Sequence, residues 1–359
     1  MKALYNDVRR SLALEELIRA EIRSGGPMTF ARFMALALYH DPLGYYRSHP
    51  DATTRAGDFL TAPETHPLFG RLLARYAASV RREIGGSEFT VVEQGAGTGA
   101  LAESFLDAWP EEAGGAAVSY AIVEPYSPAA ERLRARLPGE VRIVPDIGSI
   151  APFSGLYLSN ELPDAFPVNR VRSVEGGLRE VFVALDGDRL IEHEGPLSSP
   201  VLADWIAVAG LEVEEGAEIE VNLGIEPWLQ SVAGALEAGR ILTIDYGYDA
   251  SGVRRFPRGT LLAHYRHAAN EDFLLRIGMQ DLTAHVCWTA VERFGERAGL
   301  RRIERTNQRE FLTRLGWKEH GRALMQAPGA THAELDAVDR LGRLEEGLGG
   351  LGVLVQERM

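Results

Sequence analysis

The chain has 359 residues, of which 45% are hydrophobic and 25% are charged, and its net charge is −13. This length suits one large α/β domain with additions, or two domains. The acidic balance argues against nucleic-acid binding through a basic surface. The single cysteine excludes an internal disulfide and a cysteine-based zinc cluster. No apolar run reaches the roughly 18 residues that a membrane span needs.

Two helices are predicted at the N-terminus, before any strand. Apolar residues recur on helical spacing within the first 35 residues, and Gly25 and Gly26 break this helix before Pro27. Thr29 is the predicted N-cap of a second helix that ends at Leu38. The N-terminal region carries acidic residues and no apolar signal core, so we do not expect secretion.

Residues 39–64 follow without a regular pattern, which is long for a loop in a compact domain. We predict that this stretch is a functional loop or a lid, followed by a helix at 66–83. Its candidate ligand-contacting residues are Thr61, Asp58 and Glu64, which can fold back over a ligand. A helix N-terminus with Pro63 and Glu64 in its first turn is the other interpretation, and both can hold together.

Strands and crossover helices alternate from residue 89, which predicts an α/β fold with a parallel sheet. The predicted strands are 89–94, 119–124, 141–144, 155–159 and 240–245, with helices near 99–108, 127–136, 199–209 and 226–238. An antiparallel meander is predicted at 168–194, where a free edge could pair in a homodimer. We divide the chain into an N-terminal helical region with the covering loop (1–85), a first core half (86–167), an inserted subdomain (168–238) and a second core half (239–359) with an insertion at 247–288.

The strongest motif is a buried strand that runs into a glycine turn, at Thr90–Gly99. Its glycines, Gly95, Gly97 and Gly99, let the backbone approach a ligand where a Cβ atom would clash. Glu124 ends the next strand 25 residues after Gly99, and an acid there can accept hydrogen bonds from two ribose hydroxyls. The motif predicts a nucleoside site; a tight turn without a ligand is the alternative.

The glycine spacing is one residue shorter than in dinucleotide sites, where a helix N-terminus meets a pyrophosphate. Glu93 lies two residues before Gly95. A short turn flanked by acids suits a ligand that lacks phosphate and carries cationic sulfonium and ammonium groups. We therefore predict S-adenosylmethionine in preference to a nicotinamide cofactor.

Polar residues also follow the third and fourth predicted strands. Asp146 is a candidate acceptor for the adenine amine, or else a helix N-cap. Ser159–Pro167 places Asn160, Glu161 and Asp164 in the predicted ligand crevice. Two carboxylates can hold a guanidinium by paired charge-assisted hydrogen bonds, whereas the alternative is a capped turn.

Two further candidates lie later in the chain. Asp245 ends the fifth strand and is placed to line the crevice. His285 is a candidate base because its charge is tunable near neutral pH, although a structural histidine on an apolar strand is the alternative. His264, His267 and Asp281 lack convincing ligand spacing, so we predict no metal.

Together these segments resemble the class I S-adenosylmethionine-dependent methyltransferases of the MidA/DUF185 type, in the family's order and over nearly the whole chain. The matching segments are Leu38–Tyr46, Gly57–Glu64, Val92–Gly99, Ser159–Pro167, Asp245–Gly247, Gln280–Val286 and Val353–Gln356. Gln94 and Ala96 stand where many members have leucine and proline. Pro163 stands where members usually carry an aromatic or aliphatic residue, which could alter the loop at 160–164.

The resemblance implies a Rossmann-like sheet of seven strands, the last antiparallel, with an N-terminal helical region and an inserted α+β substrate subdomain. It also implies methylation of a protein arginine. In the mitochondrial member, a complex I assembly factor, the target is a subunit of NADH dehydrogenase. We expect a protein substrate, no nucleic acid, no membrane insertion and a bacterial cytoplasmic location.

The expected roles divide into cofactor and acceptor contacts. The cofactor residues are Glu93, Gly95, Gly97, Gly99, Glu124, Asp146 and Thr61. Glu161 and Asp164 are expected to orient the acceptor beside Asn160, and the further substrate-contacting candidates are Asp58, Glu64, Asp245 and His285. Two alternatives stay open: a non-catalytic assembly factor that binds the cofactor, and a small-molecule methyltransferase.

Overall fold

Seven strands form the central sheet of the computed structural model, which describes residues 2–49, 61–86, 88–266, 268–344 and 347–358. Their spatial order is β16-β17-β10-β5-β2-β3-β4. The bounds are β2 Thr90–Gln94, β3 Ser119–Val123, β4 Arg142–Val144, β5 Phe153–Asn160, β10 Leu236–Asp245, β16 Arg301–Asn307 and β17 Gly352–Arg358. β17 runs antiparallel to both of its neighbours and the other pairs are parallel. The predicted fold class, with its antiparallel last strand, is confirmed.

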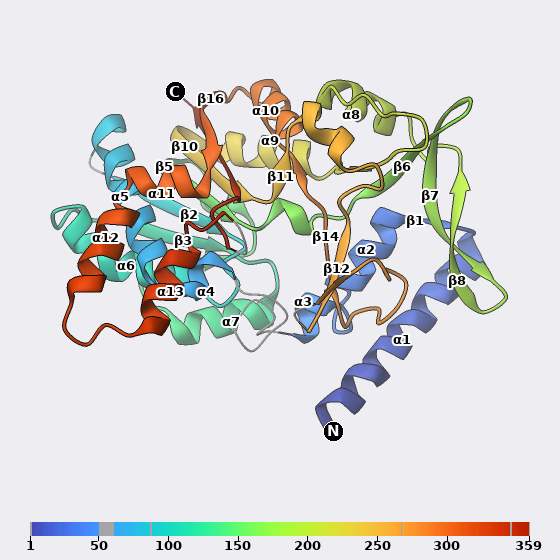
Figure 1. Ribbon diagram of the computed structural model, residues 1–359, viewed down its shortest axis with the longest axis horizontal. Helices are drawn as coiled ribbons and strands as arrows, with labels where there is room; N and C mark the ends of the chain where they lie inside the picture. The colour runs from blue at the N-terminus through green and yellow to red at the C-terminus, as the bar shows by residue number, and fades with distance from the viewer. Residues whose placement is uncertain (1, 50–60, 87, 267, 345–346, 359) are drawn as a thin grey trace.

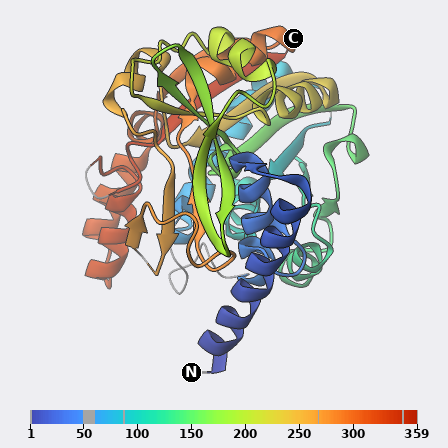
Figure 2. The same cartoon turned by 90° about the vertical axis from the view of Figure 1, so that its right-hand side faces the viewer.

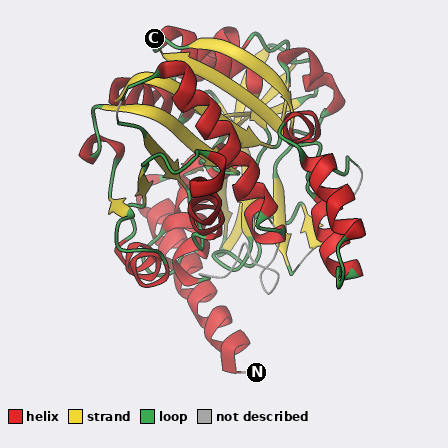
Figure 3. Ribbon diagram, turned by 90° about the vertical axis from the view of Figure 1, so that its left-hand side faces the viewer, coloured by secondary structure: helices red, strands yellow, loops and turns green. Residues whose placement is uncertain are grey.

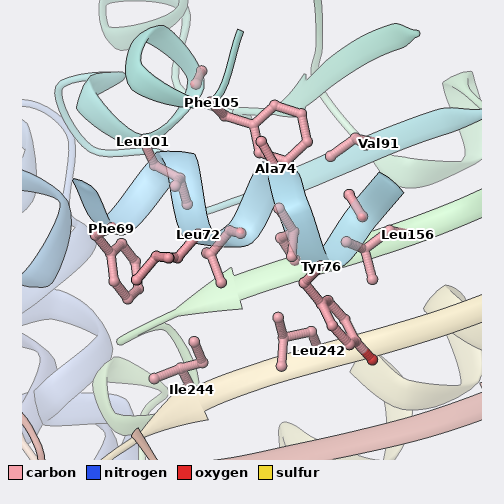
Figure 4. Packing of buried hydrophobic residues seen from close by; sticks show 14 of the residues in the cluster. Phe69, Leu72, Ala74, Tyr76, Val91, Leu101, Phe105, Leu156, Leu242 and Ile244 are labelled. Carbon is pink, nitrogen blue, oxygen red and sulfur yellow. The ribbon is translucent and has the colours of Figure 1, made fainter. Parts of the chain in front are cut away.

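Helices cover both faces of this sheet, so its middle strands are buried on each side (Figure 1). One face carries α5 (Leu68–Ile84) and α6 (Ala100–Glu112), with α11 (Gln308–Arg314), α12 (Trp317–Gln326) and α13 (His332–Arg340) beside them. Figure 4 shows Leu72 and Tyr76 of α5 packed over Leu156 and Leu242 of the sheet.

The opposite face is covered by α8 (Val201–Ala209), α9 (Ile225–Ala235) and α10 (Trp288–Arg297). Figure 3 shows the sheet between the two helical layers. α7 (Ser127–Arg136) connects β3 to β4 and contributes Leu133 to the first core. Because helices cover both faces of the sheet, a ligand crevice is expected at the carboxyl ends of its parallel strands.

A second sheet joins the N-terminal region to the first insertion. It contains β1 (Met28–Thr29), β6 (Asn169–Val174), β7 (Gly177–Asp186), β8 (Arg189–Gly195) and β9 (Glu218–Val221), and β1 pairs with β7. α2 (Phe30–Tyr39) packs against this sheet, and α1 (Lys2–Gly25) projects beyond the body of the molecule (Figure 2). A third apolar core unites α1, α2, the second sheet and residues 261–284.

The second insertion returns to the mouth of the central sheet. Its elements are β11 (Gly247–Tyr248), β12 (Leu262–Tyr265), β13 (Ala268–Asn270), β14 (Asp281–Thr283) and β15 (Val286–Cys287), with a short 3-10 helix at Ala250–Arg255. β12 pairs with both β13 and β14. Ala284 N–H donates to the Asp164 carbonyl at 2.9 Å, which ties the insertion to the loop after β5.

Several predicted boundaries differ from the observed ones. The Thr29 cap is confirmed, because its hydroxyl accepts from the Arg32 N–H at 3.2 Å. Two short helices, α3 (Tyr45–Ser48) and α4 (Ala62–Thr65), lie in the stretch predicted to be irregular. The helix predicted to end at 238 ends at 235, because Gly239 must lie in β10 against Gly155. α9, assigned to the inserted subdomain by sequence, packs on β10 of the central sheet, whereas α8 packs on α10 and on β9 of the second sheet.

None of the helices among the described residues combines the length and the apolar character that crossing a membrane requires.

We predict that Gly155→Ala destabilises the fold by about 3 kcal/mol or more. Gly155 has a φ of 151°, and a Cβ atom there would lie 1.9 Å from the Thr90 carbonyl oxygen in the neighbouring strand. Urea unfolding followed by circular dichroism measures the loss. Gly139→Ala is the matched control, since a Cβ atom there meets nothing within 4 Å. Equal stability of the two variants would contradict the prediction.

Candidate active site

A cavity of about 350 Å³ lies at the carboxyl ends of β2, β3 and β5. Its lining comes from the loops that follow these strands, from α3 and α4, and from β14. Open α/β sheets bind ligands at this edge, where neighbouring connections diverge to opposite faces. The cavity therefore occupies the position that the glycine motif predicted.

The glycine turn forms one wall of the cavity. Gly95 and Gly97 line it and adopt positive φ angles of 80° and 55°. Gly99 is outside the lining; it precedes α6 with a φ of 88°, and a Cβ atom there would lie 3.0 Å from Leu133. Gly95 and Gly97 therefore line the cavity, whereas Gly99 allows the turn to pack closely against Leu133.

Two buried or half-buried carboxylates flank this turn. Glu93 accepts a hydrogen bond from the Tyr120 hydroxyl at 2.8 Å, and burial raises the pKa of Glu93 to about 7. Glu124 accepts from the Tyr126 N–H at 2.8 Å, and burial raises its pKa while Arg47 and Arg132 oppose the rise. Both carboxylates line the cavity, as a nucleoside site at these strand ends requires.

The segment before α5 closes the cavity from the side of the glycine turn. Thr61 and Glu64 line it, and the carboxylate of Glu64 accepts a hydrogen bond from the Thr98 hydroxyl. Pro63 and Glu64 lie in α4, so the helix interpretation and the covering interpretation hold together for these residues. Asp58 lies outside the described residues.

Asn160, Glu161 and Asp164 form the other end of the cavity. Asn160 donates from Nδ2 to Glu161 Oε1 at 3.0 Å, and its Oδ1 is buried with no hydrogen-bond partner among the described residues. Glu161 has a φ of 48°, and its N–H donates to the Ile244 carbonyl at 2.8 Å. A left-handed conformation in a residue other than glycine is uncommon and is typical of functional sites.

Burial governs the titration of this end of the cavity. It raises the pKa of Glu161 to about 7. It also raises the pKa of Asp164 to about 8, with a further contribution from the charge of Glu161. Within the described part of the chain, no arginine, lysine or histidine forms an ion pair with Glu161, Asp164 or Asp245. Among the described residues, no basic side chain forms an ion pair that neutralises buried Asp164, buried Asp245 or half-buried Glu161.

The remaining predicted residues lie outside the cavity lining. Asp245 is fully buried behind Asp164, where it accepts from the Asp164 N–H at 3.2 Å and the Tyr246 N–H at 2.7 Å. Asp146 caps the 3-10 helix Ile147–Ser149, since its Oδ1 accepts from the Ser149 N–H at 2.9 Å. The geometry of Asp146 matches its N-cap interpretation.

His285 faces a different cavity, which is more open and lies between β6, β9 and the second insertion. Its ring stacks on Tyr246 with an interplanar angle of 16°, and burial lowers its pKa. The structural alternative for His285 therefore fits its surroundings better than the catalytic one. No group of three or more histidine, cysteine or carboxylate side chains in the described ranges is arranged to hold a metal ion.

Several cavity residues were missed by sequence reasoning, among them Tyr39, Tyr46, Arg47 and Asp281. Asp281 is fully buried and accepts from the Tyr46 hydroxyl at 3.0 Å. The Arg47 guanidinium lies 4.1 Å from the centre of the Tyr126 ring, beside Glu124. Tyr39, Tyr46 and Asp281 come from segments that the family resemblance covers, and Arg47 directly follows one of these segments. That coincidence was the signal that pointed to them.

Comparisons with known proteins agree with this geometry. A sequence profile of a family described as S-adenosyl-L-methionine-dependent methyltransferases matches residues 72–306. A COG1565 superfamily member from Burkholderia thailandensis, solved with S-adenosyl-homocysteine bound, is similar over 98% of this chain and 94% of its own. Its TM-score is 0.87 at 31% sequence identity.

Curated relatives are more distant in sequence. The mouse protein arginine methyltransferase NDUFAF7, mitochondrial, is 29% identical over 88% of this chain and 76% of its own length. Its human counterpart is 29% identical over 82% of this chain and 71% of its own length. The profile match spans more than half of the chain, and it includes the glycine turn, Glu124 and the part of the cavity lining that runs from Glu93 to Asp281. The chain belongs to this family of S-adenosyl-L-methionine-dependent methyltransferases.

Proposed function

We propose that this protein transfers a methyl group to a guanidinium nitrogen of an arginine in a partner protein. The observation that carries the proposal is the pair of half-buried Glu161 and buried Asp164, which lie at one end of the cofactor cavity without an ion-pair partner among the described residues. The curated relatives named as protein arginine methyltransferases support the same acceptor.

The other end of the cavity fits the cofactor. Gly95 and Gly97 present backbone without side chains, which suits close approach of the methionine part. Glu124 ends β3 with its carboxylate at the cavity, where it can accept from the ribose hydroxyls. Thr61 and Glu64 cover the glycine turn from the N-terminal side. S-adenosyl-L-methionine supplies a methyl group that its sulfonium already makes electrophilic.

Charge explains why the acceptor is a cation. A buried carboxylate is costly unless a cation or several hydrogen bonds compensate for lost hydration. A guanidinium placed between Glu161 and Asp164 would compensate both, and its planar donors match two carboxylates by paired hydrogen bonds. In its absence burial raises the pKa values of both groups, so they retain protons to higher pH.

The chain's contribution to the reaction is alignment and proton removal. Glu161 and Asp164 hold the acceptor nitrogen toward the sulfonium methyl, which lowers the entropic barrier to in-line attack. As the nitrogen–methyl bond forms and the sulfur–methyl bond breaks, sulfur keeps the electron pair of the broken bond. The methylated nitrogen loses one proton, which we assign to the Asp164 carboxylate because it lies at the acceptor end of the cavity.

The family resemblance makes a subunit of NADH dehydrogenase the first partner to test. The two insertions at the cavity side favour a protein over a small molecule, because they add surface around the acceptor end. A non-catalytic assembly factor that only binds the cofactor remains the second candidate. The resemblance to a family that includes an assembly factor favours this second candidate. A measurement of methyl transfer distinguishes it from the methyltransferase.

The deciding experiment is transfer of tritium-labelled methyl from S-adenosyl-L-methionine to proteins of a cell extract, followed by acid hydrolysis and amino-acid analysis. Label that elutes as methylarginine is the expected result. Label on lysine or on a small molecule would overturn the acceptor assignment. Cofactor binding without any transfer would support the assembly-factor alternative.

We predict that Glu124→Ala and Glu161→Gln affect different steps. Loss of the Glu124 carboxylate removes ribose contacts and should weaken S-adenosyl-L-methionine binding about tenfold or more. Glu161→Gln should leave cofactor binding within about twofold and lower turnover about 100-fold, since it acts on the acceptor. Calorimetric titration and single-turnover rates measure the two effects. Equal cofactor affinity in wild type and Glu124→Ala would contradict the ribose assignment.

We predict that kcat/KM for the acceptor rises as the pH increases from about 6 to 9. Glu161 and Asp164 bind a guanidinium only when ionised, and their raised pKa values of about 7 and about 8 keep protons on them at lower pH. In Glu161→Gln a single step should remain, and it should lie below pH 8, because the charge of Glu161 no longer raises the pKa of Asp164. A pH-independent kcat/KM over this range would contradict the assignment.

A further inference from the structure

A third carboxylate reaches the acceptor end of the cavity from outside the methyltransferase core. Asp281 begins β14 in the second insertion, lines the cavity and is 0% exposed. Its negative charge contributes to the raised pKa of Glu161, and the charges of Asp281 and Asp164 both raise the pKa of Tyr39. Asp281, Glu161 and Asp164 therefore converge on one region, although they come from separate segments of the chain.

Two hydrogen bonds fix the orientation of the Asp281 carboxylate. The Tyr46 hydroxyl donates to Oδ2 at 3.0 Å, and the Leu282 N–H donates to Oδ1 at 2.9 Å. Tyr46 belongs to α3, near the N-terminus, so the contact joins residues separated by 235 positions. A carboxylate held in this way by both oxygens has a defined orientation.

Aromatic rings form the surface beside these carboxylates. Tyr39 and Tyr46 both line the cavity and stack with a centroid distance of 5.5 Å and an interplanar angle of 25°. The Tyr39 hydroxyl is held by the Ala165 carbonyl at 2.7 Å, so its ring cannot turn freely. A flat aromatic surface next to carboxylates suits a planar delocalised cation, because a guanidinium can stack on a ring while its edges donate to acids.

We propose that Asp281 is a third acceptor-binding carboxylate, and that Tyr46 is the positioning residue that aims it. The Asp281 carboxylate and the stacked rings of Tyr39 and Tyr46 together select a planar guanidinium over a tetrahedral ammonium. This inference rests on the proposed function, and it makes the acceptor site a composite of the core, the N-terminal helices and the second insertion. Neither the core nor either addition holds the acceptor alone.

The competing explanation is purely structural: Asp281 ties α3 to β14 through the Tyr46 hydroxyl. Asp281→Asn separates the two explanations, because an asparagine of the same shape can still accept the Tyr46 hydrogen bond through its amide oxygen. The tie between Tyr46 and position 281 survives this change, although the Leu282 N–H loses its side-chain acceptor, whereas attraction of a cation by the charge does not survive. The structural explanation also predicts no difference between arginine and lysine.

The test uses the full chain saturated with S-adenosyl-homocysteine, with N-acetyl-L-arginine amide and N-acetyl-L-lysine amide as probes. Ligand-observed NMR measures their dissociation constants, and calorimetry measures S-adenosyl-homocysteine affinity. We expect wild type to bind the arginine probe at least about tenfold more tightly than the lysine probe. Asp281→Asn should weaken arginine-probe binding about tenfold and keep S-adenosyl-homocysteine affinity within about twofold.

Tyr46→Phe tests the positioning role and is the second variant if Asp281→Asn fails to fold. It keeps the ring and loses the hydroxyl, so the preference for arginine over lysine should fall by about threefold to fivefold. Tyr248→Phe and Asp272→Asn are the matched controls. Tyr248 is a buried tyrosine outside the cavity lining, and Asp272 is an exposed carboxylate of the same insertion. Both should behave as wild type.

Each contrary result has a distinct meaning. Unchanged arginine-probe affinity in Asp281→Asn would overturn the role of Asp281 and leave the proposed function standing. An unchanged arginine preference in Tyr46→Phe would overturn the positioning role alone. Equal affinity of wild type for the two probes, or binding of neither, would overturn the guanidinium selection together with the arginine acceptor.

Discussion

The cost of burying negative charge is the constraint on which the rest of this structure depends. Glu93, Glu161, Asp164 and Asp245 gather at the carboxyl edge of one sheet, where protein replaces the water that would otherwise solvate them. A rigid scaffold must hold such groups against their mutual repulsion. The doubly covered sheet provides that scaffold, since both faces of its middle strands pack against helices.

Backbone hydrogen bonds complete this support. The N–H groups of Asp164 and Tyr246 both donate to Asp245, and the loop after β5 is bonded to the end of β10 through the Glu161 N–H. Asp245 therefore links the two neighbouring strand ends while it remains outside the cavity. Burial raises the pKa of Asp245, and the charges of Asp164 and Glu161 raise it further. A cationic acceptor at the cavity would relieve part of this electrostatic cost.

The two additions to the core meet at the acceptor end rather than at the cofactor end. The third apolar core packs α1 and α2 against the second sheet and the later insertion, and this packing brings Tyr39 and Tyr46 beside Asp281. In the same segment Arg47 turns toward Tyr126 and the cofactor end. Helix α3 thus contacts both subsites through adjacent residues, which places cofactor and acceptor binding on one short element.

Local patterns determined the central sheet, because strand and helix periodicities and the glycine turn depend on near neighbours in the chain. The same patterns placed Glu93, Gly95, Gly97, Glu124, Asn160, Glu161 and Asp164 at the cavity, since parallel strands end at a common edge. For Asp146 and His285 the geometry favours the structural alternatives that the sequence left open, because Asp146 caps a 3-10 helix and His285 faces another cavity. Tyr46 and Asp281 are 235 positions apart, and nothing local couples an N-terminal tyrosine to an acid in an irregular insertion. Only the packing of the third core decided that contact, because long-range apolar burial, and not sequence proximity, brings these segments together.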